Sequence, residues 1–231
     1  MDAPLIELSG IVKQYGALRP LRIAALQVTP GAQVVLRGLD QTAAEMFVNL
    51  VTGLTLPDEG EVRLFGTATA AITDPDVWLG TLDRLAMVSD RAPLLDALTV
   101  IQNIAMPFSL AVEPPPAAIA AQAEALAVEV GLVAARFGVR IADLSPLDRL
   151  RVRLARALAF NPHVVLLEHP SASLDRGDVA AMAEDVRRVA TGRALATVAL
   201  TADSDYVNAS GASVLVLDPA TGLLKRPGWF R

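Results

Sequence analysis

LRGLDQTAAEMFVNLVTGL, residues 36–54, begins like a β-strand, turns at Gly38 and continues as a helix. A phosphate-binding loop has this order, because its glycine-rich turn joins a strand to the N-terminus of a helix. Such a loop also carries a lysine that reaches the phosphates, and residues 36–54 contain none. The order of elements therefore predicts an α/β fold, whereas the missing lysine puts the chemistry in question.

Short apolar runs recur along the chain, with helical patterns between most of them. Such runs are typical of strands buried on both faces, and strands that alternate with helices form a largely parallel sheet. The runs are VVL (34–36), LAMV (85–88), VVLL (164–167), TVAL (197–200) and VLVL (214–217). Residues 4–9, 22–28 and 60–66 predict a small antiparallel layer near the N-terminus, with its turns in GLTLPDEGE.

The middle of the chain, from about residue 94 to 160, shows no convincing strand and predicts a helical insert. Two apolar stripes have helical spacing; they are Ile119, Leu126, Val130 and Val133, and then Leu150, Leu154 and Leu158. EPPP at 113–116 must be a loop or a helix boundary, because proline removes a backbone donor and restricts the residue before it. We expect one domain over residues 1–231, with an α/β core at 1–93 and 161–231 and a helical subdomain at 94–160.

Composition narrows the class of protein. Of 231 residues 53% are hydrophobic, yet no segment offers the roughly 18 uninterrupted apolar residues that span a bilayer. The N-terminus, MDAPLIELSG, lacks the basic and apolar regions of a signal peptide, so we expect a cytoplasmic protein. With no cysteine and two histidines the chain is poor in metal ligands, and its net charge of -5 disfavours nucleic acid as a partner. We expect a protein or a small ligand as partner.

Six framework motifs, in their order and spacing, resemble the nucleotide-binding subunit of an ABC transporter over nearly the whole chain. They are VKQYG (12–16), NLVTGL (49–54), PDEGEVRLFG (57–66), PLLDALTVIQNIAMPF (93–108), RVRLARALAFNP (151–162) and PSASLD (170–175). Within them, LTVIQNIAMPF looks most like the lipoprotein-release, cell-division and macrolide-export branch, and a lipid-transport relative is nearly as close.

The resemblance implies a P-loop NTPase (RecA-like) fold of the α/β class. Its core would have a mostly parallel sheet, with a small antiparallel β layer near the N-terminus and an α-helical insert. In the family this fold hydrolyses ATP with magnesium, works as a dimer and drives transport through a membrane permease.

The phosphate-binding loop departs from the family pattern. The family's loop, G-x-x-G-x-G-K-S/T, cradles phosphates with backbone N–H groups, while its lysine and hydroxyl contact phosphate and magnesium. Gly38 matches, but Gln41 and Ala43 replace glycines, Ala44 replaces the lysine, and Glu45 and Met46 replace the hydroxyl pair. A carboxylate at Glu45, about 4 Å from a phosphate, would cost on the order of a few kcal/mol at an effective dielectric of about 20.

The family's other nucleotide contacts are also changed. The resemblance places Asp90 at the glutamine that senses magnesium, Glu168 at the magnesium aspartate, His169 at the glutamate that polarises water, and Ala202 at the switch histidine. Glu168 could hold a metal through water, and His169 could act as a base because imidazole titrates near neutral pH. Without a phosphate cradle we expect neither role, and we treat these positions as vestigial.

The family signature LSGGQ, which closes on a partner's γ-phosphate across the dimer, is LSPLD here. Ser145 matches, whereas Pro146 and Leu147 replace the two glycines. Pro146 has no N–H to offer, and Leu147 crowds the approach. The chain is therefore expected neither to run its own site nor to complete a partner's site.

Two residues that match the family's binding pattern have structural interpretations as well. Tyr15 lies where an aromatic ring would stack on adenine, but a tyrosine after a strand is also an ordinary packing residue, and we favour packing. Asp175 lies where the family makes contacts across its dimer, but it also suits the N-terminus of a helix. Both interpretations of Asp175 stay open.

Both helix starts that would face the γ-phosphate carry capping patterns. Thr42 and Glu45 have the S/T-x-x-E spacing of a capping box. Ser145 suits a cap, with proline at the first helical position and Asp148 at the third. We hypothesise that the carboxylates of Glu45 and Asp148 stand in for a bound anion; the alternative is that the sites have decayed and any helix former would serve.

These observations predict a degenerate ABC ATP-binding subunit, a pseudo-ATPase with no catalytic residue, no metal and no bound cofactor. We expect a structural or regulatory subunit on the cytoplasmic face of the plasma membrane, docked on a membrane permease through the cleft near residues 90–108. Its dimer partner would be a second copy or another ABC ATPase subunit. The alternatives are a weak ATP-binding subunit that uses Tyr15 and Glu168, a soluble scaffold without a permease, and an active ATPase.

Overall fold

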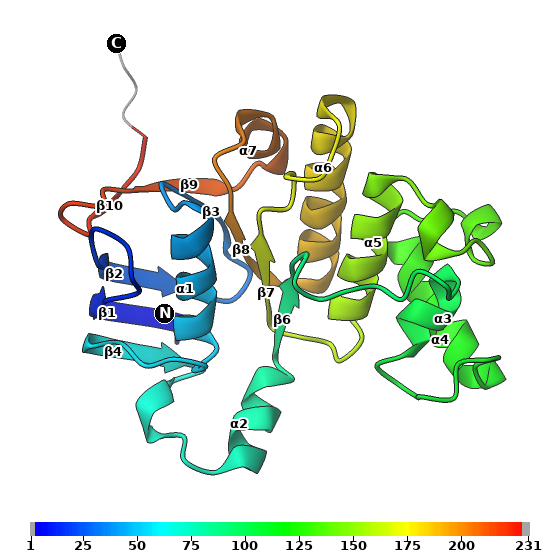
Figure 1. Ribbon diagram of the computed structural model, residues 1–231, viewed down its shortest axis with the longest axis horizontal. Coiled ribbons are helices and arrows are strands. Elements are labelled where there is room, and N and C mark those ends of the chain that lie inside the picture. The colour runs from blue at the N-terminus through cyan, green and yellow to red at the C-terminus, as the bar shows by residue number, and fades with distance from the viewer. Residues whose placement is uncertain (1–2, 228–231) are drawn as a thin grey trace.

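The computed structural model describes residues 3–227 and contains two β-sheets that share a hydrophobic core with helix α1 (Gln41–Val51) (Figure 1). The smaller sheet has the strand order β2-β1-β4-β5 and is antiparallel throughout. Its strands are β1 (Ile6–Lys13), β2 (Leu21–Val28), β4 (Glu59–Leu64) and β5 (Thr67–Ala68). This sheet confirms the antiparallel layer predicted near the N-terminus.

The larger sheet has the order β10-β9-β3-β8-β7-β6, and all of its pairings are parallel except that of β10 with β9. Its strands are β3 (Gln33–Arg37), β6 (Leu85–Val88), β7 (Val164–Glu168), β8 (Ala196–Leu200), β9 (Ser213–Leu217) and β10 (Leu224–Lys225). Each of the five predicted apolar runs lies in one of these strands. The predicted fold class is therefore confirmed.

Seven α-helices and three short 3-10 helices surround the sheets over the described part of the chain. Besides α1 they are α2 (Pro75–Leu82), α3 (Val100–Ala105), α4 (Ala117–Glu129), α5 (Pro146–Ala157), α6 (Arg176–Arg193) and α7 (Ser204–Ser210), with the 3-10 turns at Thr69–Ala71, Ala134–Arg136 and Ile141–Asp143. α5, α6 and α7 lie on the side of the parallel sheet away from β1 and β2 (Figure 1).

The strands of the larger sheet are apolar on both faces because each face covers a different core. Leu36, Val164 and Leu166 pack with α1 and the antiparallel sheet. Their neighbours in the chain, Val35, Val165 and Leu167, face the other side of the sheet and pack with α5, α6 and the insert. This alternation explains why the runs are continuously apolar and not alternating.

The segment between β6 and β7 is helical, as predicted, and only an isolated bridge joins Thr99 to Arg140. Leu126 and Val130 are buried on or just after α4, and Leu150, Leu154 and Leu158 are buried along α5. Pro116 immediately precedes α4, which agrees with a helix boundary in EPPP. The prediction for Val133 is wrong: α4 ends at Glu129, Gly131 turns the chain at φ +93°, and Val133 is 62% exposed.

The structure also tests for membrane-spanning helices. Over residues 3–227, none of the helices combines the length and the apolar character needed to cross a bilayer.

Candidate functional site

The connection between β3 and α1 consists of Gly38, Leu39 and Asp40. α1 begins at Gln41, so residues 41–45 of the eight-residue loop pattern are helical. In a phosphate-binding loop the helix follows the glycine-rich turn. Here the helix has extended into the turn and left three residues outside it.

Asp40 caps α1. Its carboxylate Oδ1 accepts the backbone N–H of Ala43 at 2.8 Å, and its carbonyl accepts the N–H of Ala44 at 2.9 Å. The predicted capping box of Thr42 and Glu45 is therefore wrong, because Thr42 lies inside the helix, and the Glu45 carboxylate faces the amide of Gln41 at 3.4 Å. Asp40, two residues earlier in the chain, accepts a different unpaired donor, the N–H of Ala43, and the helix is longer as a result.

Alanine substitutions should distinguish the cap seen in the structure, Asp40, from the predicted cap, Thr42. Asp40→Ala is expected to lower the free energy of unfolding by about 1 kcal/mol, because the Ala43 N–H loses its acceptor. Thr42→Ala should leave stability unchanged or raise it slightly, because alanine is the better residue inside an exposed helical turn. Urea unfolding of both variants measures the difference. A loss at Thr42 with none at Asp40 would restore the capping box.

Ala44, at the family's lysine position, lies in the core. It is fully buried in the cluster formed by α1 and the antiparallel sheet, and Met46 packs against the same cluster. Ala44, which the resemblance aligns with the family's lysine, is thus part of the hydrophobic packing below α1.

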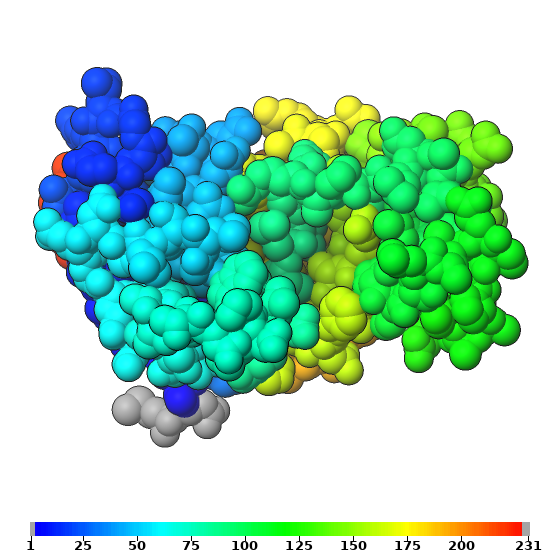
Figure 2. All heavy atoms as spheres, turned by 60° about the horizontal axis from the view of Figure 1, so that its bottom comes forward, coloured from blue at the N-terminus to red at the C-terminus, as the bar shows by residue number. Residues whose placement is uncertain are grey.

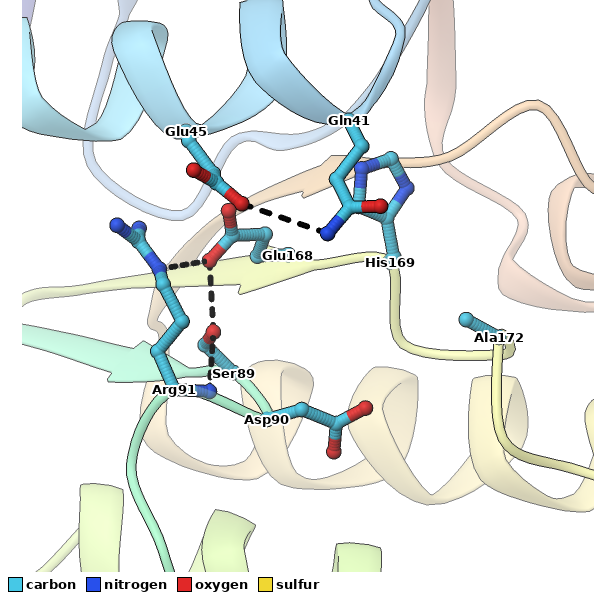
Figure 3. Close-up of a pocket in the computed structure, with 8 residues that line it drawn as sticks. All are labelled: Gln41, Glu45, Ser89, Asp90, Arg91, Glu168, His169 and Ala172. Atoms are coloured by element: carbon cyan, nitrogen blue, oxygen red, sulfur yellow. Dashed lines mark hydrogen bonds and ion pairs between the residues drawn. The ribbon is translucent and has the colours of Figure 1, made fainter.

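A cavity of about 380 Å³ lies where α1 meets the carboxyl ends of β6 and β7 (Figure 3). Open parallel sheets commonly bind ligands at this edge. The residues that line the cavity are Gln41, Glu45, Ser89, Asp90, Arg91, Glu168, His169 and Ala172. The structure thus brings together four of the predicted positions, namely Glu45, Asp90, Glu168 and His169.

Glu168 is held by two neighbours from the end of β6. Its side chain is nearly buried, and its Oε2 accepts the Ser89 hydroxyl at 2.7 Å and Nε of Arg91 at 2.9 Å (Figure 3). The Ser89 oxygen in turn accepts the backbone N–H of Arg91 at 3.1 Å. The charge of Glu168 is therefore matched inside the protein, by what we call the Ser89–Arg91–Glu168 clamp.

Ser89 and Arg91 were missed by the sequence analysis. A usable signal was present, because Ser89 directly follows a predicted strand and Arg91, two residues later, is the first cation after that strand. Since β6 and β7 pair in parallel, residues just past their carboxyl ends become neighbours.

His169 and Asp90 have other surroundings. His169 adopts a left-handed backbone with φ +47°, and its N–H donates to the Leu200 carbonyl at 3.0 Å. Its ring Nε2 is enclosed and has no hydrogen-bond partner among the described residues. Asp90 pairs with Arg153 of α5 at 2.8 Å. Within residues 3–227, no three acidic or histidine side chains gather as a metal would require.

The comparison with known proteins decides the family. The family model described as ABC transporter matches residues 21–172. The chain belongs to the ABC transporter family. This confirms the resemblance of the framework motifs.

Curated relatives include ABC subunits of different systems. The methionine import ATP-binding protein MetN of Brucella abortus (strain 2308) is 27% identical over 99% of this chain, which spans 61% of that relative's length. The lipoprotein-releasing system ATP-binding protein LolD of Saccharophagus degradans is 32% identical over 76% of this chain and 78% of its own. A lipoprotein-release subunit is thus among the relatives, as the insert phrase suggested.

Solved ABC structures share the fold. The cbiO1 protein of Clostridium perfringens, part of the ABC transporter complex cbiONQ, superposes with a TM-score of 0.81 at 16% identity, covering 97% of this chain and 88% of that one. A dimeric bacterial ABC transporter cassette gives a TM-score of 0.78 at 21% identity, covering 97% and 100%.

The signature region of this ABC chain caps α5. The Ser145 hydroxyl accepts the N–H of Asp148 at 3.2 Å, and Pro146 is the first helical residue, as predicted. Leu147 is buried. The Asp148 carboxylate pairs with Arg136 at 3.3 Å and Arg151 at 3.2 Å, so the surrounding arginines balance its charge.

The remaining positions lie outside the cavity lining. Tyr15 is half-buried against the core of the antiparallel sheet, and partial burial followed by the charge of Asp40 raises the pKa of Tyr15. Ala202 is exposed, and its carbonyl accepts Nη2 of Arg37 at 3.2 Å. Asp175 precedes α6 at the cap position, although its side chain makes no capping hydrogen bond.

Proposed function

We propose that this chain is an ABC ATP-binding subunit that has lost nucleotide chemistry and acts as a structural or regulatory partner of a membrane permease. A single observation carries the proposal: α1 begins at Gln41, inside the segment that would wrap the phosphates. The relatives are named as ATP-binding proteins of import and release systems. By analogy, this chain would lie against the inner face of the membrane, paired with a second copy or with another ABC subunit.

The residues at the start of α1 do not fit a nucleotide phosphate. A helix N-terminus binds an anion with its unpaired N–H groups. The carboxylate of Asp40 already accepts one of these groups, the N–H of Ala43. The Glu45 carboxylate lines the cavity where a phosphate would approach, and two negative charges in a partly enclosed site repel each other.

The residues of the cavity do not fit magnesium either. One oxygen of Glu168, Oε2, already holds the Arg91 guanidinium and the Ser89 hydroxyl, and the guanidinium would repel an incoming cation. The positions of the family's magnesium hydroxyl carry Glu45 and Met46. Ion pairing inside the protein thus satisfies the carboxylate that a divalent ion would require.

We further propose that the chain is one domain, with a core at residues 1–93 and 161–231 and a helical subdomain at 94–160. In support, α3, α4 and α5 follow one another between two adjacent strands, β6 and β7, and share one cluster of buried residues. The permease would dock near residues 90–108, where the subdomain joins the core.

Calorimetric titration of the chain with ATP and magnesium tests the loss of nucleotide chemistry. We expect no saturable heat at millimolar nucleotide for the wild type or for Glu45→Ala, because the closed turn excludes phosphate whether or not the carboxylate is present. An ABC subunit with an intact loop, titrated in parallel, is the positive control.

One result would contradict the proposal, and another would contradict only its structural reason. Micromolar binding by the wild type would make the chain a nucleotide-binding subunit. Binding by Glu45→Ala alone would show that charge excludes the nucleotide and that the helical start of α1 does not.

A further inference from the structure

Polar contacts hold the helical insert against the core on two opposite sides of α5. Arg151 and Arg153 are two positions apart, and since the residues of an α-helix follow one another at about 100° around its axis, their side chains leave opposite faces. Arg151 pairs through Nε with Asp185 of α6 at 2.8 Å. Arg153, on the other face, pairs with Asp90 in the turn after β6 at 2.8 Å.

On the α6 side, the last residue of that helix, Arg193, contacts two elements of the insert. Its Nε and Nη2 reach the two carboxylate oxygens of Glu129, the last residue of α4, at 2.6 Å and 2.5 Å. Its Nη1 donates to the carbonyl of Leu158, just after α5, at 3.2 Å. A guanidinium that binds both oxygens of a carboxylate is strongly oriented. This side of the insert is therefore fixed, but contacts along one side alone still allow the insert to tilt.

On the other side of α5 lies what we call the β6 turn, residues 89–93. The Ala92 N–H donates to the Ser89 carbonyl at 3.2 Å and closes the turn. The Ser89–Arg91–Glu168 clamp attaches the turn to the core, since Glu168 belongs to β7 (Figure 3). In Figure 2 the blue-green residues that follow β6 lie between the cyan residues of the core and the green residues of the insert.

The same turn is attached to the insert by two arginines of α5. The Asp90 carboxylate pairs with Arg153 at 2.8 Å. The Pro93 carbonyl accepts Nη1 of Arg156 at 2.9 Å. The Arg153 side chain is only 17% exposed, and no other carboxylate of the described residues pairs with it. Moving the turn away from α5 would therefore leave an enclosed charge without a partner, which is costly.

We infer that the β6 turn holds the insert at one fixed angle to the core, with the Arg193 contacts as the support on the opposite side. The turn meets the core through Glu168 and the insert through Arg153, so the insert cannot tilt without breaking an ion pair of an enclosed side chain. The family resemblance places the glutamine that senses magnesium at Asp90, and in this chain an internal ion pair occupies that residue. Core and insert thus move as one body, and a partner that contacts both meets a single fixed surface.

The distance between two spin labels tests the inference on the full chain. The chain has no cysteine, so Ala25→Cys in β2 and Ala121→Cys in α4, both at exposed positions, place one label on the core and one on the insert. Pulsed electron paramagnetic resonance should give one narrow distribution of distances. Asp90→Ala in the labelled chain should add a second distance or broaden the distribution about twofold, because the insert is then held firmly on one side only.

Asp96→Ala is the matched control. Asp96 lies in the same connection between β6 and α3 and faces the same helix, but its carboxylate is 4.0 Å from Arg149 and its side chain is 68% exposed. An exposed pair of this kind contributes little, so the distribution should stay narrow. Equal distributions for the Asp90 and Asp96 variants would overturn the inference. If Asp90→Ala does not fold, Asp90→Asn, which removes the charge and keeps the shape, takes its place.

Hydrogen exchange of the unlabelled wild type gives an independent measurement. The Arg91 N–H donates to the Ser89 hydroxyl oxygen at 3.1 Å, and the Ala92 N–H is bonded within the turn. Both amides should exchange at least about tenfold more slowly than those of residues 16–19, which have no acceptor among the described residues. Equal exchange rates in the two segments would overturn the inference.

The inference goes beyond the proposed function and can fail separately from it. ATP binding by the wild type in the calorimetric titration would reject the loss of nucleotide chemistry and leave the β6 turn its role. A wild-type distribution with two distances would reject that role whether or not ATP binds.

Discussion

Gly38→Ala is expected to lower the free energy of unfolding by about 3 kcal/mol. Gly38 has φ +90°, where an L-residue costs about 1–2 kcal/mol. A Cβ at this position would also lie 2.6 Å from the carbonyl oxygen of Leu217 in β9, a contact that only a shift of backbone can relieve. Such overpacking adds about 1–3 kcal/mol. Urea unfolding followed by circular dichroism measures the loss.

Gly66→Ala is the matched control. Gly66 has φ +83°, but no atom lies within 4 Å of the place that an alanine methyl group would take, so the substitution should cost about 1 kcal/mol. An equal loss at the two positions would mean that the contact with Leu217 is unimportant. A larger loss at Gly38 would give this glycine of the loop pattern a structural role that does not depend on a phosphate.

Arg91→Ala is expected to lower the free energy of unfolding by about 2 kcal/mol. Removing one partner of a buried ion pair costs about 3–5 kcal/mol, because the other charge is left without compensation. Glu168 is 5% exposed at its side chain, but Arg91 is 37% exposed, so water offsets part of the loss. Chemical denaturation at neutral pH measures the effect.

Glu168→Gln provides the control for charge. Glutamine keeps an oxygen that accepts the Ser89 hydroxyl but carries no charge that needs Arg91. The double variant Arg91→Ala/Glu168→Gln should therefore be more stable than Arg91→Ala alone. Strict additivity of the two substitutions would show that the guanidinium and the carboxylate are not coupled.

The main strands could be predicted because their signal is local. VVLL at 164–167 and TVAL at 197–200 are apolar at nearly every position, as both faces of the sheet are covered. The stripe on α5 was equally predictable from its spacing. The prediction for Val133 was wrong because the helical spacing continues in the sequence beyond Gly131, whereas the helix itself ends before this glycine.

The residue at which α1 begins could not be predicted from the local sequence. Asp40 and Thr42 are both good caps, and propensity alone does not choose between them. The choice depends on the turn at Gly38, which lies against Leu217, a residue far away in the sequence. Once β9 fixes this turn, the chain is in position to begin its helix at Gln41.

The sequence by itself determined the order of elements and the family, and it showed that residues 36–54 contain no lysine and that proline and leucine follow Ser145, because these are properties of individual positions and of their spacing. Only the tertiary structure decided which neighbours the residues of these segments contact. Ser89 and Arg91 reach Glu168 because β6 and β7 pair in parallel. Asp90 reaches Arg153 because α5 packs beside the end of β6. Compensation of charge depends on distance in space, and that distance is set by strand pairing and helix packing across segments nearly 80 residues apart in the chain.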